Sequence, residues 1–266
     1  MLTRLYTSPP EPVPVVPWRI NLLGGIRARR EHLLITGFRT RRAAILLARL
    51  ALNPRPHRRD ELIQMFWPDA DSQAGRQNLS QSLSELRRRL ETLHDSEFVF
   101  ASRETVWLER HLLVTDVEEF ERALSLARGT TGAERVRNLE LAVEIASAPL
   151  LPGVEYDWAV ASRERITAEC DAALRELVSC HEAAGNLTAA FEYAWRRVRI
   201  DPLDEQAHRE FTHLYERAER PAAGLRHLQV LEQDLSESLG SRPDDETRAL
   251  AESLRVRLRE LARSAH

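Results

Sequence analysis

Residues 75–90, GRQNLSQSLSELRRRL, combine a leucine repeat with side chains suited to binding a nucleic acid. The leucines recur at spacings of four, three and four residues, which places them on one face of an α-helix. They are Leu79, Leu83, Leu86 and Leu90. The other face carries amides, a hydroxyl and a guanidinium, on Gln77, Asn78, Gln81, Ser84 and Arg88. Such groups hydrogen-bond to base edges and phosphates when a helix enters a major groove about 12 Å wide. A solvated surface helix has the same pattern, so the flanking elements must distinguish the two interpretations.

The elements around this helix favour binding to a nucleic acid. Short apolar runs broken by Gly24-Gly25 predict strands and turns over residues 18–36, and two helical patterns end at Pro54 and Pro68. Residues 97–110 alternate apolar and polar positions around a polar centre, which predicts a β-hairpin. Strands, three helices and a terminal hairpin, in this order, predict a winged helix-turn-helix.

Charge is unevenly distributed along the 266 residues. Residues 18–115 hold 17 arginines against 11 acidic residues, a net charge of +6, whereas residues 116–266 hold 20 against 29, a net charge of −9. There is no lysine, because all 38 basic residues are arginine. A basic first half beside an acidic second half favours a phosphate-binding surface in the first.

The remaining sequence predicts a second, helical domain in a cytoplasmic protein. Residues 1–17 are rich in proline and predict a disordered leader, and no apolar run is long enough for a signal peptide or a membrane span. Residues 116–266 predict helices with short breaks between them and a weak repeat at an offset of 34 residues, the tetratricopeptide period. The predicted breaks fall at Gly129 to Gly132, Pro149 to Gly153, Gly185-Asn186, Asp201-Pro202, Arg220-Pro221 and Gly240 to Pro243. Cys170 and Cys180 lie ten residues apart in one helical pattern. That spacing of about 15 Å is too long for a disulfide, which fits a reducing compartment.

In order and motif, the chain resembles the Streptomyces antibiotic regulatory proteins. These join an OmpR-type winged helix to a bacterial transcriptional activator domain. The resemblance spans residues 18–260 and is carried by FRTRRAAILLARLAL, RRDELIQMFWPDA, RQNLSQSLSELRRRL, TDVEEFERAL, ASAPLLPG, DPLDEQAHREFTHLYE and LEQDLSESLGSRPDDETRAL. It implies a mainly α fold with a small β component, a winged helix over residues 18–115 and a tetratricopeptide-like array over 116–266. The implied function is that of a transcriptional activator whose partners are double-stranded DNA, RNA polymerase and a second protomer.

The same resemblance implies a set of DNA-binding residues. Base-facing positions fall on Gln77, Asn78, Gln81, Ser82 and Glu85. The arginines expected around them are Arg76, Arg87 and Arg88 on the same helix, Arg103 at the hairpin centre, and Arg39, Arg41 and Arg42 at the start of the first helix. Arginines at a helix N-terminus oppose the helix dipole, which favours a role for that cluster in binding phosphates.

Glu85 departs from this pattern, because family members commonly carry a basic residue at the equivalent position. Its carboxylate would repel DNA phosphates, accept a hydrogen bond from a cytosine amino group, or pair along the helix with Arg88 or Arg89. We expect repulsion that the neighbouring arginines partly offset.

Motifs for enzymatic chemistry are missing from the sequence. No GK[ST], GxGxxG, HExxH or zinc-ligand spacing occurs, and Asp69 and Asp71 are explained as a helix cap rather than as metal ligands. We therefore expect no enzyme, cofactor or metal site, and a DNA-binding activator whose residues 18–115 bind duplex DNA without the helical half. The alternative is an interaction adaptor whose winged helix has lost sequence-specific DNA binding, which Glu85 and the acidic half would favour.

Overall fold

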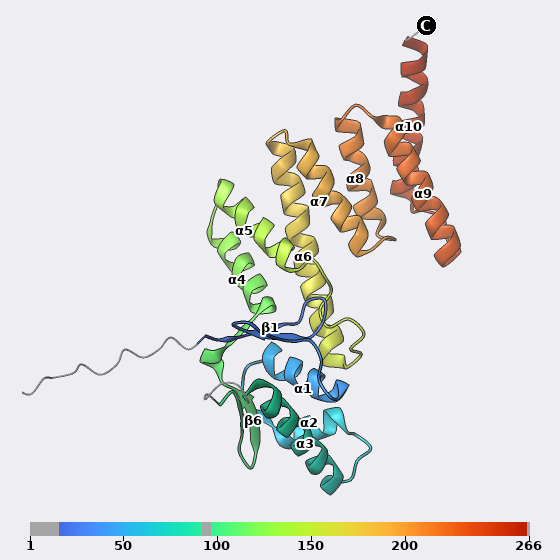
Figure 1. The fold of residues 1–266 in the computed structure, drawn as a ribbon. Coiled ribbons are helices and arrows are strands. Elements are labelled where there is room, and N and C mark those ends of the chain that lie inside the picture. The colour runs from blue at the N-terminus through green and yellow to red at the C-terminus, as the bar shows by residue number, and fades with distance from the viewer. Residues whose placement is uncertain (1–15, 92–96, 265–266) are drawn as a thin grey trace, which may run out of the picture. The chain divides into compact units, whose positions relative to one another are not determined.

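The structure is a computed structural model that describes residues 16–91 and 97–264. The described residues form two compact units (Figure 1). The first runs up to Glu119 and includes Leu150–Val154, and the second contains Phe120–Pro149 and the residues from Glu155 onward. Most elements are helices and the strands are confined to the first unit, so the predicted fold class is confirmed.

The first unit is a winged helix with two small sheets. One has the order β3-β2-β1-β7, in which β1 is antiparallel to β2 and parallel to β7, and the other has the order β4-β6-β5. The strands are β1 (Trp18–Asn21), β2 (Arg27–Arg30), β3 (Leu33–Ile35), β4 (His57–Arg58), β5 (Val99–Ala101), β6 (Thr105–Leu108) and β7 (Leu113–Thr115). The helices are α1 (Arg41–Leu52), α2 (Arg59–Phe66), α3 (Ser72–Leu90) and a short 3-10 turn, η1 (Arg110–Leu112).

Local sequence sets where the helices of this unit begin. Thr40 caps α1, because its hydroxyl accepts a hydrogen bond from the N–H of Ala43 at 3.1 Å. Asp71 caps α3 by accepting from the N–H groups of Gln73 and Ala74, both at 2.8 Å, and these bonds lower the pKa of Asp71. The capping role predicted for Asp71 is therefore confirmed. Gly75 is required for close packing, since a Cβ there would clash with the Ile63 side chain of α2.

The first unit also includes Leu150–Val154, a segment that comes much later in the sequence and that we call the strap. Leu150 forms a β-bridge with Leu23, and the N–H of Leu151 donates to the carbonyl of Leu22 at 2.9 Å. The Leu151 side chain is fully buried, although its backbone has a left-handed φ of 44°. The sequence predicted only a break between helices here. The difference arises because the apolar side chains of the break cover the core of the first unit.

Asp116, the first residue of α4 (Asp116–Gly129), also contacts the chain at the end of β1. Its buried carboxylate accepts hydrogen bonds from the N–H groups of Leu22, Leu23 and Val117, each at 2.9 Å. Burial raises the pKa of Asp116, whereas these hydrogen bonds act in the opposite direction. The first unit thus extends beyond residue 115, and a fragment of residues 18–115 lacks both Asp116 and the strap.

The second unit is an array in which consecutive helices pack against one another (Figure 1). After α4 these are α5 (Gly132–Ile145), α6 (Asp157–Ala183), α7 (Leu187–Ile200), α8 (Glu205–Arg217), α9 (Pro221–Leu239) and α10 (Asp245–Ser264). The boundaries after α6, α7, α8 and α9 coincide with the predicted breaks. Cys170 and Cys180 are both free and both lie on α6, as expected. Within the described residues, every helix is too short or too polar to cross a membrane.

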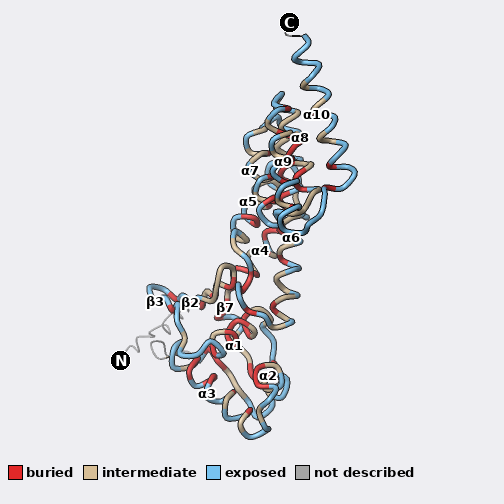
Figure 2. Tube along the Cα trace, turned by 90° about the vertical axis from the view of Figure 1, so that its right-hand side faces the viewer, coloured by how far each residue is buried: buried red, intermediate tan, exposed pale blue. Residues whose placement is uncertain are grey.

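Ionic and aromatic clusters join neighbouring helices of the array, whose buried residues appear in red in Figure 2. The Arg197 side chain on α7 is 1% exposed and contacts Asp171 of α6 at 2.7 Å and Glu210 of α8. Phe211 is buried in the core of the array, whereas Trp195 remains 47% exposed.

His208 and His227 stack within the aromatic part of the array, with ring centroids 4.8 Å apart. Burial lowers the pKa of both imidazoles, to about 4 for His227, where repulsion by a charged His208 is the second cause of the lowering. Both rings are therefore neutral near pH 7.

The strap provides a first test of this fold. We expect Leu151→Ala to lower the free energy of unfolding of the full chain by about 2–5 kcal/mol, because it removes a fully buried side chain. Leu34→Ala, at a position 58% exposed in the same unit, should change it by no more than about 0.5 kcal/mol. Denaturant unfolding measures both variants. Equal effects would show that the strap does not stabilise the first unit.

The histidine pair provides a second test, through the pH dependence of stability. The pKa of His227 is lower in the folded protein than in the unfolded chain, so unfolding takes up a proton. Its contribution to stability is therefore complete above about pH 6.5 and is lost as the pH falls toward 4. Thermal unfolding between these pH values should show a weaker pH dependence for His227→Phe than for the wild type. The exposed His213→Phe should retain the wild-type dependence, and an unchanged slope in His227→Phe would contradict the assignment.

Candidate nucleic-acid interface

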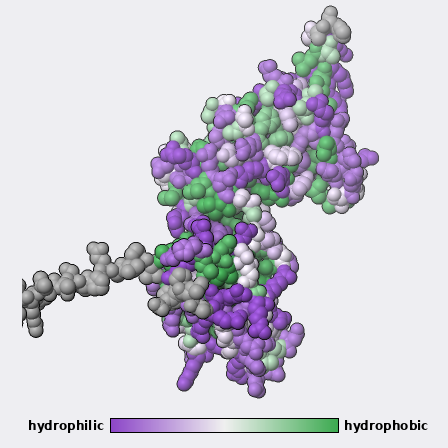
Figure 3. Space-filling model, viewed as in Figure 1, coloured by the Kyte–Doolittle hydropathy of each residue, from purple (hydrophilic) through white to green (hydrophobic). Residues whose placement is uncertain are grey.

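Burial of the leucine stripe fixes the orientation of α3 in the first unit. Leu79, Leu83, Leu86 and Leu90 are all between 0% and 2% exposed. The remaining faces of α3 are mostly exposed and polar, and Figure 3 shows a hydrophilic surface over the part of the unit that contains α2 and α3. The predicted structural role of the leucines is confirmed.

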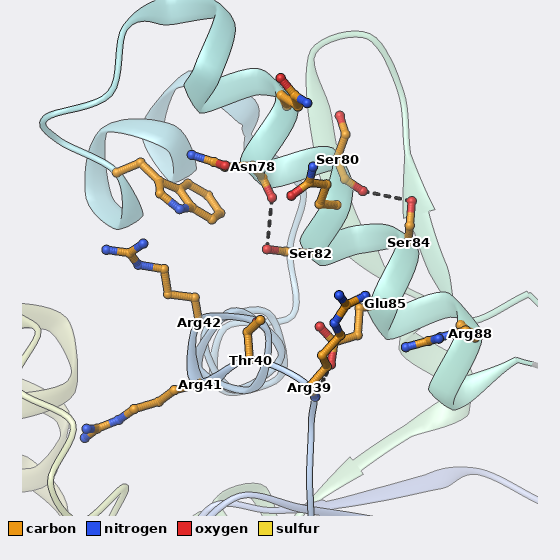
Figure 4. Close-up of a pocket in the computed structure, with 13 residues that line it drawn as sticks. Arg39, Thr40, Arg41, Arg42, Asn78, Ser80, Ser82, Ser84, Glu85 and Arg88 are labelled. Atoms are coloured by element: carbon orange, nitrogen blue, oxygen red, sulfur yellow. Dashed lines mark hydrogen bonds between the residues drawn. The ribbon is translucent and has the colours of Figure 1, made fainter.

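A groove of about 1030 Å³ runs between α3 and the start of α1 (Figure 4). Its lining combines guanidinium, amide, hydroxyl and carboxylate groups with one indole. These belong to Arg39, Thr40, Arg41 and Arg42 at the start of α1, to Trp67, and to Gln77, Asn78, Ser80, Gln81, Ser82, Ser84, Glu85 and Arg88 of α3. Two helices that are distant in sequence thus share one polar surface.

The groove brings together most of the residues expected to contact DNA. It contains Gln77, Asn78, Gln81, Ser82, Glu85 and Arg88, together with Arg39, Arg41 and Arg42. It does not contain Arg76, Arg87 or Arg103. Sequence analysis overlooked Thr40, Trp67 and Ser80. Thr40 had a usable signal, because a threonine before a helical pattern is a typical N-cap.

The exposed face of α3 differs in part from the expected one. Gln77 and Gln81 are exposed and Asn78 is half-buried, as hydrogen bonding to an incoming partner requires. Ser82 is only 7% exposed and donates to the carbonyl of Asn78 at 3.0 Å. Ser82 therefore presents little surface to a partner, although it lines the groove.

Glu85 also differs from its expected environment. The residue is 7% exposed, and its carboxylate accepts a hydrogen bond from the backbone N–H of Arg39. The sequence suggested repulsion of phosphates, a bond to cytosine, or an ion pair on a solvated face. A contact with the backbone that immediately precedes α1 could not be anticipated from α3 alone.

The arginines of α3 have different surroundings. Arg87 is half-buried and its Nε donates to the carbonyl of Val99 at 3.0 Å, so it joins α3 to the hairpin. Arg76 is exposed, and its guanidinium lies 2.5 Å from the Ser72 hydroxyl. Arg88 is exposed on the groove wall.

Arginines outside α3 extend this basic surface. Arg103 is exposed at the turn between β5 and β6, the tip of the predicted wing. Arg41 donates to the carbonyl of Gly153 in the strap and extends away from α3 (Figure 4). Arg59, overlooked in the sequence, donates to the Ser80 hydroxyl at 3.3 Å and so joins α2 to α3. The sequence feature that could have identified Arg59 is a basic residue in the first turn of α2.

Two comparisons place this architecture among known proteins. The sequence model of the family described as "Bacterial transcriptional activator domain" matches residues 115–255. No significant match was found among curated proteins.

Among the described residues, no three His, Cys, Asp or Glu side chains are grouped so that they could hold a metal ion.

A solved structure shares the fold of both units. Mycobacterium tuberculosis EmbR, solved in complex with a low-affinity phosphopeptide, matches with a TM-score of 0.68 at 18% sequence identity. The match covers 90% of this chain but only 65% of the EmbR chain. The family match itself covers more than half of the 266 residues. The chain therefore belongs to the bacterial transcriptional activator domain family.

Proposed function

We propose that this regulator activates transcription by binding double-stranded promoter DNA through its winged helix. The observation that carries the proposal is the groove in which the exposed amides of α3 face the arginines at the start of α1. This combination suits DNA, because amides bind base edges and arginines bind phosphates.

In this proposal the two walls of the groove contact different parts of the DNA, the bases on one side and the phosphates on the other. Gln77, Asn78 and Gln81 contact base edges in the major groove, where a glutamine or asparagine makes paired hydrogen bonds with adenine. Arg39 and Arg42 contact the adjacent phosphates, and the N-terminus of α1 adds the favourable field of its dipole. Arg103, at the hairpin tip, approaches the minor groove.

The helical array supplies the contacts with protein partners. Stacked helix pairs present extended surfaces that bind other proteins. In this proposal those partners are RNA polymerase and a second protomer, whereas the first unit contacts DNA. The opposite charges of the two halves support this division, because an acidic surface has little affinity for DNA phosphates.

The alternative function, an adaptor without sequence-specific DNA binding, has lost one of its two supports. It rested on the acidic second half and on the expectation that Glu85 exposes a negative charge where DNA would bind. The carboxylate is instead buried and hydrogen-bonded to a backbone N–H. Selection of bound fragments from genomic DNA separates the two functions, because only the activator enriches a repeated sequence motif.

A salt titration tests the phosphate contacts. We expect the affinity of the full chain for a selected duplex to fall steeply with salt. In a plot of the logarithm of the binding constant against the logarithm of the salt concentration, each neutralised phosphate contributes about −0.9 to the slope. Arg42→Ala should weaken binding to selected and scrambled duplexes alike and reduce the slope by about 1. Arg29→Ala, an exposed arginine on β2 outside the groove, is the matched control. Salt-independent binding, or equal losses in both variants, would argue against this surface.

Substitution of an amide tests base recognition. Gln81→Ala should relax the preference at one base pair of the selected site, at a cost of about 1–3 kcal/mol, because it removes hydrogen bonds to one base edge. Binding to a scrambled duplex should hardly change. Gln73→Ala, exposed on α3 but outside the groove, should leave the preference intact. Competition with single-base variants of the site measures both. An unaltered preference in Gln81→Ala would place α3 outside the major groove.

A further inference from the structure

The carboxylate of Glu85 lies on the wall of the proposed DNA-binding groove, but the residue is buried. It lines the groove, yet only 7% of the residue is accessible. Burial of a carboxylate is costly unless hydrogen bonds compensate for the lost water. The hydrogen-bond donor that stabilises this buried carboxylate therefore indicates the role of Glu85.

That group is the backbone N–H of Arg39, which lies 46 residues earlier in the chain. Arg39 immediately precedes Thr40, the N-cap of α1. The hydrogen bond thus joins α3 to the chain at the point where α1 begins, and the two side chains lie together in Figure 4. The positive end of the α1 dipole at this point also favours a carboxylate.

The start of α1 is held from a second direction within the same unit. Arg41 donates to the carbonyl of Gly153 in the strap, whereas Glu85 holds the preceding turn from α3. Thr40, between them, bonds to its own helix: its hydroxyl accepts from the N–H of Ala43 and its carbonyl accepts from the N–H of Ala44. Removal of Glu85 would free one side of the arginine-bearing segment while the strap contact remains.

We propose that Glu85 is a positioning residue that fixes the arginines of α1 beside the base-facing side of α3. Both helices then contact the same stretch of DNA, with Arg39 and Arg42 on the phosphate backbone. The inference rests on the proposed DNA binding, and it assigns Glu85 no contact with a base.

The number of phosphates bound distinguishes positioning from general stabilisation of the fold. A variant that is only less stable contains less folded protein, but its folded molecules release the same counterions. A variant with a displaced α1 segment contacts fewer phosphates, so the salt slope itself becomes shallower. Glu85→Gln retains a carbonyl oxygen as acceptor for the Arg39 N–H, whereas Glu85→Ala has none.

The experiment is a salt titration of the full chain against a selected duplex. We expect the slope of Glu85→Ala to be shallower by about 2, the loss of the Arg39 and Arg42 contacts. Glu85→Gln should keep the wild-type slope and bind at least as tightly as the wild type. Ile20→Val is the matched control for a general loss of stability and should keep the wild-type slope, because Ile20 is also buried but lies on β1, outside the groove. In an Arg39→Ala/Arg42→Ala background, Glu85→Ala should change the slope no further.

Several results would overturn the proposal. A wild-type slope in Glu85→Ala would show that Glu85 positions nothing, and equal losses in Glu85→Gln would show that charge alone matters. If Glu85→Ala does not fold, Glu85→Asp replaces it, because its side chain is one methylene shorter and should also make the slope shallower.

Amide hydrogen exchange of Arg39 separates this inference from the proposed function. The amide should exchange slowly in the wild type and in Glu85→Gln, and quickly in Glu85→Ala. Fast exchange in the wild type would overturn the inference even if DNA binds. If the wild type bound no duplex at low salt, the proposed function would fail, and the exchange rates would still determine whether Glu85 holds the start of α1.

Discussion

The orientation of α3 about its own axis is the constraint on which the candidate interface depends. Four leucines on one stripe are almost completely buried, and burial of each side chain contributes about 1.5–3 kcal/mol. An ion pair along an exposed helix contributes only a few tenths of a kcal/mol. The leucines therefore determine which side of α3 faces solvent, and the polar residues occupy the positions that remain. Gln77 and Gln81 are exposed for this reason, whereas Ser82 and Glu85 are buried.

The first unit achieves a complete core only with residues from beyond the winged-helix segment. Asp116 accepts the backbone N–H groups at the end of β1, and the strap covers the adjacent apolar side chains. The start of α1 also depends on the strap, because Arg41 donates a hydrogen bond to the carbonyl of Gly153 within the same unit.

The helical array relies on a different kind of contact. Arg197 is buried between carboxylates of the two neighbouring helices, where its guanidinium can meet both at once. Loss of this arginine would leave Asp171 and Glu210 without their shared partner, which is more harmful than the loss of an exposed ion pair. The stacked histidines are compatible with this core only while they remain neutral.

Sequence alone determined the elements of this protein, their order and most residues of the groove. Periodicity identified the helices and the hairpin, because 3.6-residue and two-residue repeats reflect the faces that each element must bury. Proline and glycine marked their ends, and Asp71 was recognisable as a cap. The tertiary structure alone decided the environment of Glu85, the contact between Arg87 and Val99, and the docking of the strap. Each of these depends on a partner many residues away, and local patterns carry no information about which distant backbone groups will need a partner when the core closes.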